Sequence, residues 1–217
     1  MTFAQLTDAV LRRLAETPSA PISFTRAEVQ TALNDGLAEL ADASEWYETY
    51  RTIDLLDTRP YYDARDVLGD DVLTIGAAYN DQTSRWLIPS AIRELDGHDD
   101  QWESVVGEPE RLIQRGLWWL GYWPRLGSDA GTVKQYFTAL PANLDEDLDE
   151  PGFPDALHEG VIEFALADLW AQSGEATNAV EAWTRYEAYE AALTAWVQNR
   201  AAVPMVKGHA QSGDLAH

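Results

Sequence analysis

Apolar side chains recur every three or four residues in the first 45 residues, which predicts two amphipathic helices. The first helix should cover residues 2–16 and the second residues 25–43. Thr2 and Thr25 each stand three residues before a glutamine or a glutamate, the capping-box spacing that is typical of a helix start. Each helix has one apolar face and therefore needs a partner to cover it. The two stripes are formed by Phe3, Leu6, Val10 and Leu14, and by Val29, Leu33, Leu37 and Leu40.

Between residues 46 and 141 the pattern changes to short alternating segments separated by clusters of aspartate, glycine and asparagine. This pattern predicts strands joined by turns, in a small antiparallel sheet or sandwich. Successive side chains of a strand point to opposite faces, so one of Trp118 and Trp119 should enter the core while the other is exposed or at an interface. A short turn or helix is expected at Ala91–Leu95. The expected strands are residues 50–55, 72–78, 84–88, 111–114 and 132–140.

Helical periodicity returns after an acidic crossover at residues 142–152, whose charges should repel and hold it extended. Pro154 suits a first helical turn, and the break at Ser173–Glu175 predicts an antiparallel helical hairpin over residues 153–200. Residues 201–217 have no core pattern and form an expected tail. The predicted fold is therefore α+β and mainly helical. Helix pairs at both ends (1–45 and 153–200) pack together in a single domain of residues 1–200, with a β-rich insert at 46–141.

The chain carries 37 acidic and 15 basic residues, a formal net charge of −22 over 217 residues. Such a surface repels phosphate backbones and argues against tight nucleic-acid binding. The acidity fits adaptation to high salt, a channel past which DNA slides without sticking, or both. The scarcity of lysine, with only Lys134 and Lys207 present, belongs to the high-salt interpretation. Zero cysteines exclude disulfides and thiol chemistry. With neither a signal-peptide pattern nor a run of eighteen apolar residues, we expect no membrane segment.

The usual spacings of catalytic and metal-binding residues are missing, so we expect no enzyme activity, no cofactor and no metal site. His158–Glu159 begins like a zinc-protease helix, but position 162 is isoleucine, and His158 is better interpreted as a helix-start residue that bonds locally. Asp145, Asp147 and Asp149 match half of a calcium loop, which leaves only a weak cation site open. The turn at Gly127–Gly131 lacks a nucleophile-elbow context.

The order of features from Gly107 onward resembles the head–tail adaptor (connector) proteins of tailed viruses. A Gly-x-Pro at Gly107–Pro109 opens a strand, a second strand ends in Pro124, and an aromatic-bearing strand covers Val133–Phe137. An aspartate-rich turn then leads to a helix start with Pro154 and His158. The resemblance implies a structural virion protein, made in the host cytoplasm, that forms a ring, usually a dodecamer, in the neck between portal and tail.

The resemblance also implies the partners and sites. The partners would be the portal protein, other copies of the chain and downstream tail or stopper proteins, while genome DNA passes through without specific binding. An aromatic ladder of Trp183, Tyr186 and Tyr189 would seal subunit against subunit. The tail would bind the portal through Ala202, Val203, Pro204, Met205, Val206, Lys207, Gly208 and His209. Two alternatives stay open: a carbohydrate-binding or glycan-degrading protein that uses exposed tryptophans and carboxylates, and an unassigned cytosolic protein of a salt-loving cell. A plain disordered terminus is the alternative for the tail.

Overall fold

The computed structural model describes residues 1–56, 59–97, 101–116, 118–127 and 131–202. The chain divides into two compact units, Met1–Trp46 with Pro141–His217, and Tyr47–Leu140. We call them the helical unit and the β unit, and each is described by itself. The α+β class predicted from the sequence is confirmed, because helices from both ends of the chain share one unit and two small sheets lie between them in the sequence.

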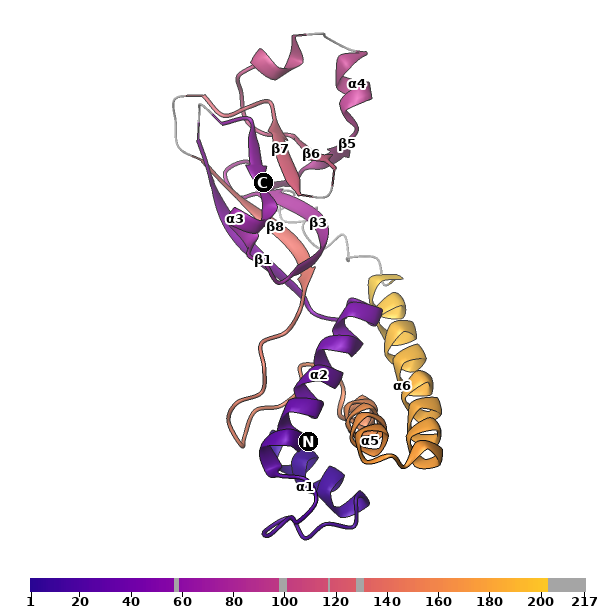
Figure 1. The fold of residues 1–217 in the computed structure, drawn as a ribbon. Helices are drawn as coiled ribbons and strands as arrows, with labels where there is room; N and C mark the ends of the chain where they lie inside the picture. The colour runs from indigo at the N-terminus through magenta and orange to yellow at the C-terminus, as the bar shows by residue number, and fades with distance from the viewer. Residues whose placement is uncertain (57–58, 98–100, 117, 128–130, 203–217) are drawn as a thin grey trace, which may run out of the picture. The chain divides into compact units, whose positions relative to one another are not determined.

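The helical unit contains α1 (Phe3–Arg13), α2 (Arg26–Ser44), α5 (Glu159–Ser173) and α6 (Ala176–Ala202) (Figure 1). Both predicted capping boxes are present, at Thr2 and Thr25. Helix α1 ends three residues before the predicted residue 16, and Ala15 there has a positive φ of 59°. Helix α2 packs on α5 and α6, so the two helix pairs cover each other's apolar faces as expected.

The hairpin of α5 and α6 turns at Gly174, whose φ of 82° lies in the left-handed region that glycine adopts without strain. The predicted stop at Ser173–Glu175 is confirmed. A short 3-10 turn at Asp155–Leu157 precedes α5, so the α-helix begins at Glu159 and not at Pro154. The side chains at the centre of this unit include Leu6, Leu33, Leu40, Ile162, Leu166 and Tyr186, each at most 1% exposed.

The acidic crossover is not simply extended, and that expectation was wrong. The Asp149 carboxylate accepts hydrogen bonds from the backbone N–H groups of Asp145 and Glu146, at 2.9 and 2.8 Å, which folds the segment into a turn. Asn34 of α2 fixes its start by bonding both backbone groups of Leu144. Local side-chain-to-backbone bonding outweighs repulsion here, because exposed carboxylates are well solvated and screened.

The β unit holds two four-stranded sheets with the orders β1-β8-β3-β4 and β2-β7-β6-β5. All pairs are antiparallel except β5 with β6, which are parallel, so the predicted antiparallel sandwich is correct apart from this edge. The five strands expected from the pattern are present, the predicted 84–88 strand being divided between two sheets at Leu87. The strands are β1 (Glu48–Leu55), β2 (Tyr61–Asp63), β3 (Val72–Asn80), β4 (Arg85–Trp86), β5 (Ile88–Ser90), β6 (Arg111–Arg115), β7 (Trp119–Trp123) and β8 (Gly131–Ala139).

Two short helices complete the β unit, α3 (Ala64–Leu68) and α4 (Ile92–Asp96), with a 3-10 turn at Trp102–Ser104. Helix α4 agrees with the short element expected at Ala91–Leu95, whereas β2 and α3 were not predicted. Trp118 packs partly buried against the core and Trp119 is 47% exposed, so the expected division of this pair is confirmed.

A buried glutamine joins the two sheets. Gln135 on β8 accepts a hydrogen bond from the hydroxyl of Tyr122 on β7, at 3.1 Å. Its amide nitrogen lies 2.9 Å from the carbonyl oxygens of Gly76 and Tyr136 and 3.1 Å from that of Ala77. The pairing of β3 with β8 is irregular between Ile75 and Ala78, and this amide supplies donors to the carbonyl groups that the irregularity frees.

Candidate functional site: an apolar groove on the helical unit

A groove of about 460 Å³ runs between α5 and α6. Phe164 and three small or acidic residues of α5 line one side, and Val180 and Trp183 of α6 line the other. Val180 is 67% exposed and Trp183 is 43% exposed, an unusual surface position for large apolar side chains on a helix. Exposed apolar surface that is concave and bordered by polar groups is typical of a protein interface. The remaining lining residues are Ala167, Asp168, Ala171, Ala179, Thr184 and Glu187.

Three aromatic rings that contact one another at tilted and edge-on angles lie at and beneath this groove. The ring of Trp183 lies 5.1 Å from that of Tyr186 and 6.0 Å from that of Phe164, and Phe164 lies 5.3 Å from Tyr186. The indole N–H of Trp183 donates to Glu187 Oε1 at 3.1 Å, so its polar atom is satisfied within the helix while the ring stays at the surface. An aromatic ring held in this way loses little side-chain entropy when a partner covers it.

The structure places Trp183, Tyr186 and Tyr189 of the predicted ladder at different depths. Only Trp183 reaches the groove surface; Tyr186 is 1% exposed and lies beneath it. Burial, with the nearby carboxylates of Glu190 and Glu39, raises the pKa of Tyr186 above its ordinary value. Tyr189 is half-buried and packs against Gly160, where an added Cβ would lie 2.9 Å from the Tyr189 Cβ. A ladder spaced three residues apart drifts around the helix surface, so its members reach different depths.

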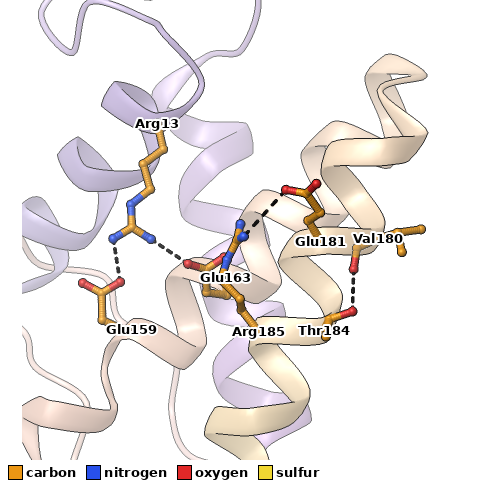
Figure 2. A network of polar contacts seen from close by, with 7 residues as sticks. All are labelled: Arg13, Glu159, Glu163, Val180, Glu181, Thr184 and Arg185. Atoms are coloured by element: carbon orange, nitrogen blue, oxygen red, sulfur yellow. Dashed lines mark hydrogen bonds and ion pairs between the residues drawn. The ribbon is translucent and has the colours of Figure 1, made fainter.

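A network of ion pairs fixes the hairpin that carries the groove (Figure 2). The Glu163 carboxylate on α5 accepts from Arg13 Nη1 at 2.8 Å and from Arg185 Nε at 2.9 Å, joining α1, α5 and α6. Arg13 also donates to Glu159 Oε2 at 2.7 Å, and Arg185 lies 4.0 Å from Glu181. The Glu163 side chain is 7% exposed, so its charge needs these two guanidinium partners.

Sequence reasoning did not single out this network or the groove. Glu163 stands between Ile162 and Phe164 within an apolar stretch of the helix, and that position was the signal for a buried carboxylate that needs a cation. The partners could not be identified, because Arg13 lies 150 residues away in the sequence. Val180 fitted the apolar stripe of the last helix, where a valine is most often a core residue, so its exposure at the groove was not foreseen.

The candidate catalytic and metal-binding residues take part in structural contacts where the structure describes them. His158 is 1% exposed, and its Nε2 lies 2.9 Å from the backbone oxygen of Phe153, as expected of a helix-start residue that bonds locally. Across the described ranges, no three histidine, aspartate or glutamate side chains gather where they could hold a metal ion. The described helices include none that is both long and apolar enough to cross a membrane. Ser128–Ala130 of the turn at Gly127–Gly131 lie outside the described residues, as do the predicted portal-binding residues 203–209.

Comparison with known families decides the class. The profile of the SU10 adaptor protein family matches residues 1–208. The chain belongs to the SU10 adaptor protein family. No curated protein matches the chain. The resemblance to head–tail adaptors of tailed viruses, stated on the residues from Gly107 onward, is therefore confirmed over almost the whole chain.

Membership makes the chain a structural adaptor of a tailed-virus particle. It also implies a location in the virion neck, in association with portal and tail components. The groove belongs to the helical unit of an adaptor, and its geometry has to be interpreted in that setting. A salt-loving host stays a prediction from composition.

Proposed function

We propose that the chain is the head-to-tail adaptor that forms a ring between portal and tail, with the α5–α6 groove as part of the contact between neighbouring copies. The observation that carries this proposal is Trp183, a large apolar side chain 43% exposed over a groove on the helical unit of an adaptor. Tyr186 lies beneath and supports the ring of Trp183, whereas Tyr189 packs against Gly160 and would stabilise the hairpin that carries the groove.

A ring needs a heterologous contact, in which one patch of a subunit meets a different patch of the next. The groove supplies a concave apolar patch, and the same unit carries two exposed apolar side chains elsewhere, Ile22 at 93% and Leu148 at 83%. Each is an aliphatic side chain of the size that an apolar groove accepts. Burying Trp183 at such a contact would contribute roughly 1.5–3 kcal/mol.

The charge of the helical unit supports a role in lining the DNA channel. Residues 1–46 and 141–217 carry 21 acidic and 6 basic residues, against 16 acidic and 9 basic residues in 47–140. Carboxylates that face the lumen would repel the phosphate backbone, so the genome would slide past without forming lasting contacts. The same charge works against ring closure at low ionic strength, so assembly should strengthen with salt.

The C-terminal segment is proposed to bind the portal protein. Val203, Pro204, Met205 and Val206 are four apolar residues in succession after the last helix, followed by Lys207, Gly208 and His209. A short apolar segment of this kind suits docking into a groove of another protein. Ala202 is the last residue of α6 and would be the point from which the segment extends.

The experiment compares Trp183→Ala with Trp119→Ala, a second tryptophan that is 47% exposed but belongs to the β unit. Each variant is mixed with portal protein, and assemblies are counted by native mass spectrometry and light scattering. We expect Trp183→Ala to lower the yield of full rings on the portal, with Trp119→Ala close to wild type. Unaltered ring formation by Trp183→Ala would overturn the role of the groove. A chain truncated after Ala202 should lose portal binding, and its retention would overturn the role of the tail.

A further inference from the structure

Four aromatic side chains form a continuous row on one side of the β1-β8-β3-β4 sheet. Tyr50 stands opposite Tyr136 in the pairing of β1 with β8, with ring centroids 5.3 Å apart. Trp86 lies 5.2 Å from Tyr136, and Tyr79 lies 5.2 Å from Trp86. The row therefore crosses all four strands of the sheet. We call these four residues the aromatic face.

The aromatic face is on the solvent side of the sheet. Buried and half-buried residues alternate along β8, where Val133, Gln135 and Phe137 point into the core and Lys134 and Tyr136 point the other way. The outer side of such a sheet is ordinarily polar. Cross-strand aromatic pairs stabilise a sheet by roughly 0.2–1 kcal/mol each, which accounts for the contacts but not for the exposure. Tyr50 is 51% exposed and Trp86 is 43% exposed, and surface aromatic clusters of this kind are typical of binding sites.

The charges around the row are mainly negative. Glu48 and Asp54 lie on β1 two and four residues from Tyr50, so they project from the same side of the strand. Lys134 lies on this side too, 5.8 Å from the Tyr50 ring, but it forms a 2.9 Å ion pair with Asp81. That hydrogen bond raises the pKa of Lys134, so the lysine stays charged and held by its own carboxylate. A partner would therefore meet aromatic rings bordered by carboxylates.

We propose that the aromatic face binds an arginine-bearing segment of another protein. A guanidinium group is planar and weakly hydrated, so it stacks on tyrosine and tryptophan rings while it pairs with neighbouring carboxylates. A second copy of this chain is a poor occupant, because each copy has 37 acidic residues against 15 basic ones. Nucleic acid is repelled for the same reason.

The geometry of the rings disfavours a sugar. A glycan stacks best on flat, coplanar and separated ring faces, whereas these rings touch one another at interplanar angles of 38°, 46° and 67°. Such a ridged surface instead accommodates side chains of a protein, each in the gap between two tilted rings. The aromatic face thus fits a basic protein partner better than it fits the other three classes.

The test titrates a probe peptide of alternating arginine and leucine into the full chain and follows binding by calorimetry. A lysine–leucine peptide of equal length and charge is the chemical control. Trp86→Ala and Tyr50→Ala are the test variants, and Trp119→Ala, exposed to 47% on β7 of the other sheet, is the matched control. We expect each test variant to lower the affinity for the arginine peptide on the order of tenfold, and the control variant to bind it as wild type does. The lysine peptide should bind the wild-type chain several-fold more weakly than the arginine peptide.

Several outcomes would overturn the proposal. Equal affinities for the lysine and arginine peptides would show that binding is nonspecific charge attraction and does not depend on the guanidinium group. Loss of binding in Trp119→Ala as much as in Trp86→Ala would move the site elsewhere. Saturable binding of a cello- or chito-oligosaccharide that Trp86→Ala abolishes, without binding of the arginine peptide, would assign the face to a glycan. If circular dichroism shows that Trp86→Ala unfolds the β unit, Tyr50→Ala decides the matter, because its side chain is the more exposed of the two.

Discussion

Gly36 on α2 and Phe164 on α5 lie so close that a Cβ at position 36 would stand 2.8 Å from Phe164 Cδ1 and 3.0 Å from the Phe164 Cβ. The absence of a side chain at residue 36 lets the two helices approach closely at this point. Phe164 then directs its ring toward Tyr186 and Trp183 and lines one side of the α5–α6 groove. Packing inside the helical unit therefore sets the shape of the surface proposed for ring contact.

Gly36→Ala should destabilise the helical unit although alanine is the better helix former. The added methyl group gains about 1 kcal/mol in helix propensity, but overpacking against Phe164 costs roughly 1–3 kcal/mol. We expect a net loss of about 1 kcal/mol in the free energy of unfolding. Chemical denaturation followed by circular dichroism measures it. A variant more stable than wild type would mean that α5 moves away freely.

Glu163→Gln should weaken the packing of α1 and α6 on α5. The carboxylate is nearly buried and pairs with Arg13 and Arg185, which are 37% and 47% exposed, so solvent compensates part of the loss. We expect about 1–2 kcal/mol of destabilisation in urea unfolding. The matched control is Glu181→Gln, whose carboxylate is 67% exposed and 4.0 Å from Arg185; it should cost less than about 0.5 kcal/mol. Equal costs would show that the buried position of Glu163 contributes nothing.

Stability should respond to acid through the capping box of α2. Hydrogen bonds from the backbone N–H and then the hydroxyl of Thr25 lower the pKa of Glu28 below its ordinary 4.5. A group with a lowered folded-state pKa stabilises the fold above its ordinary value, and this contribution is lost as the pH falls through the folded-state pKa. The melting temperature of Glu28→Gln should therefore lie below that of wild type at neutral pH, and the gap should close in acid.

The control for this titration is Asp42→Asn, an exposed carboxylate near the other end of the same helix. A carboxylate near a helix C-terminus opposes the helix dipole, so its removal should leave the melting temperature unchanged or raise it slightly. A gap between wild type and Glu28→Gln that stays constant from neutral pH to acid would contradict the assigned cause. Thermal scans by circular dichroism over the same buffers measure both variants.

Added salt should stabilise the chain. With a net charge of −22, like charges repel across the folded surface, and the Debye length falls from about 30 Å at 0.01 M salt to about 10 Å at 0.1 M. We expect the melting temperature to rise steeply over this range and to level off well below molar concentrations. Potassium chloride titration in a differential scanning calorimeter tests it, with sucrose as a control for preferential exclusion. A melting temperature that falls with salt would mean that the ion pairs outweigh the repulsion.

The sequence predicted most of the fold, because the signals involved were local. The capping boxes at Thr2 and Thr25, the stop at Gly174 and the alternation along β8 are each set by residues that are neighbours in the chain. The missed elements, β2 and α3, are three and five residues long, too short for a periodic pattern to stand out. The prediction of an extended crossover was wrong because the Asp149 carboxylate bonds backbone N–H groups three and four residues back, which charge counting cannot reveal.

By itself, the amino-acid order determined the α+β class, the helical ends, the β-rich middle and the adaptor family, since these depend on periodicity, turn chemistry and the order of motifs. Only the tertiary structure decided that Tyr186 lies beneath Trp183, that Glu163 meets Arg13 from 150 residues away, and that four aromatic residues from four strands form one face. The physical reason is the same in all three cases. Depth, ion pairing and surface clustering depend on which segments pack together, and that is settled by the free energy of the whole unit rather than by neighbours in the chain.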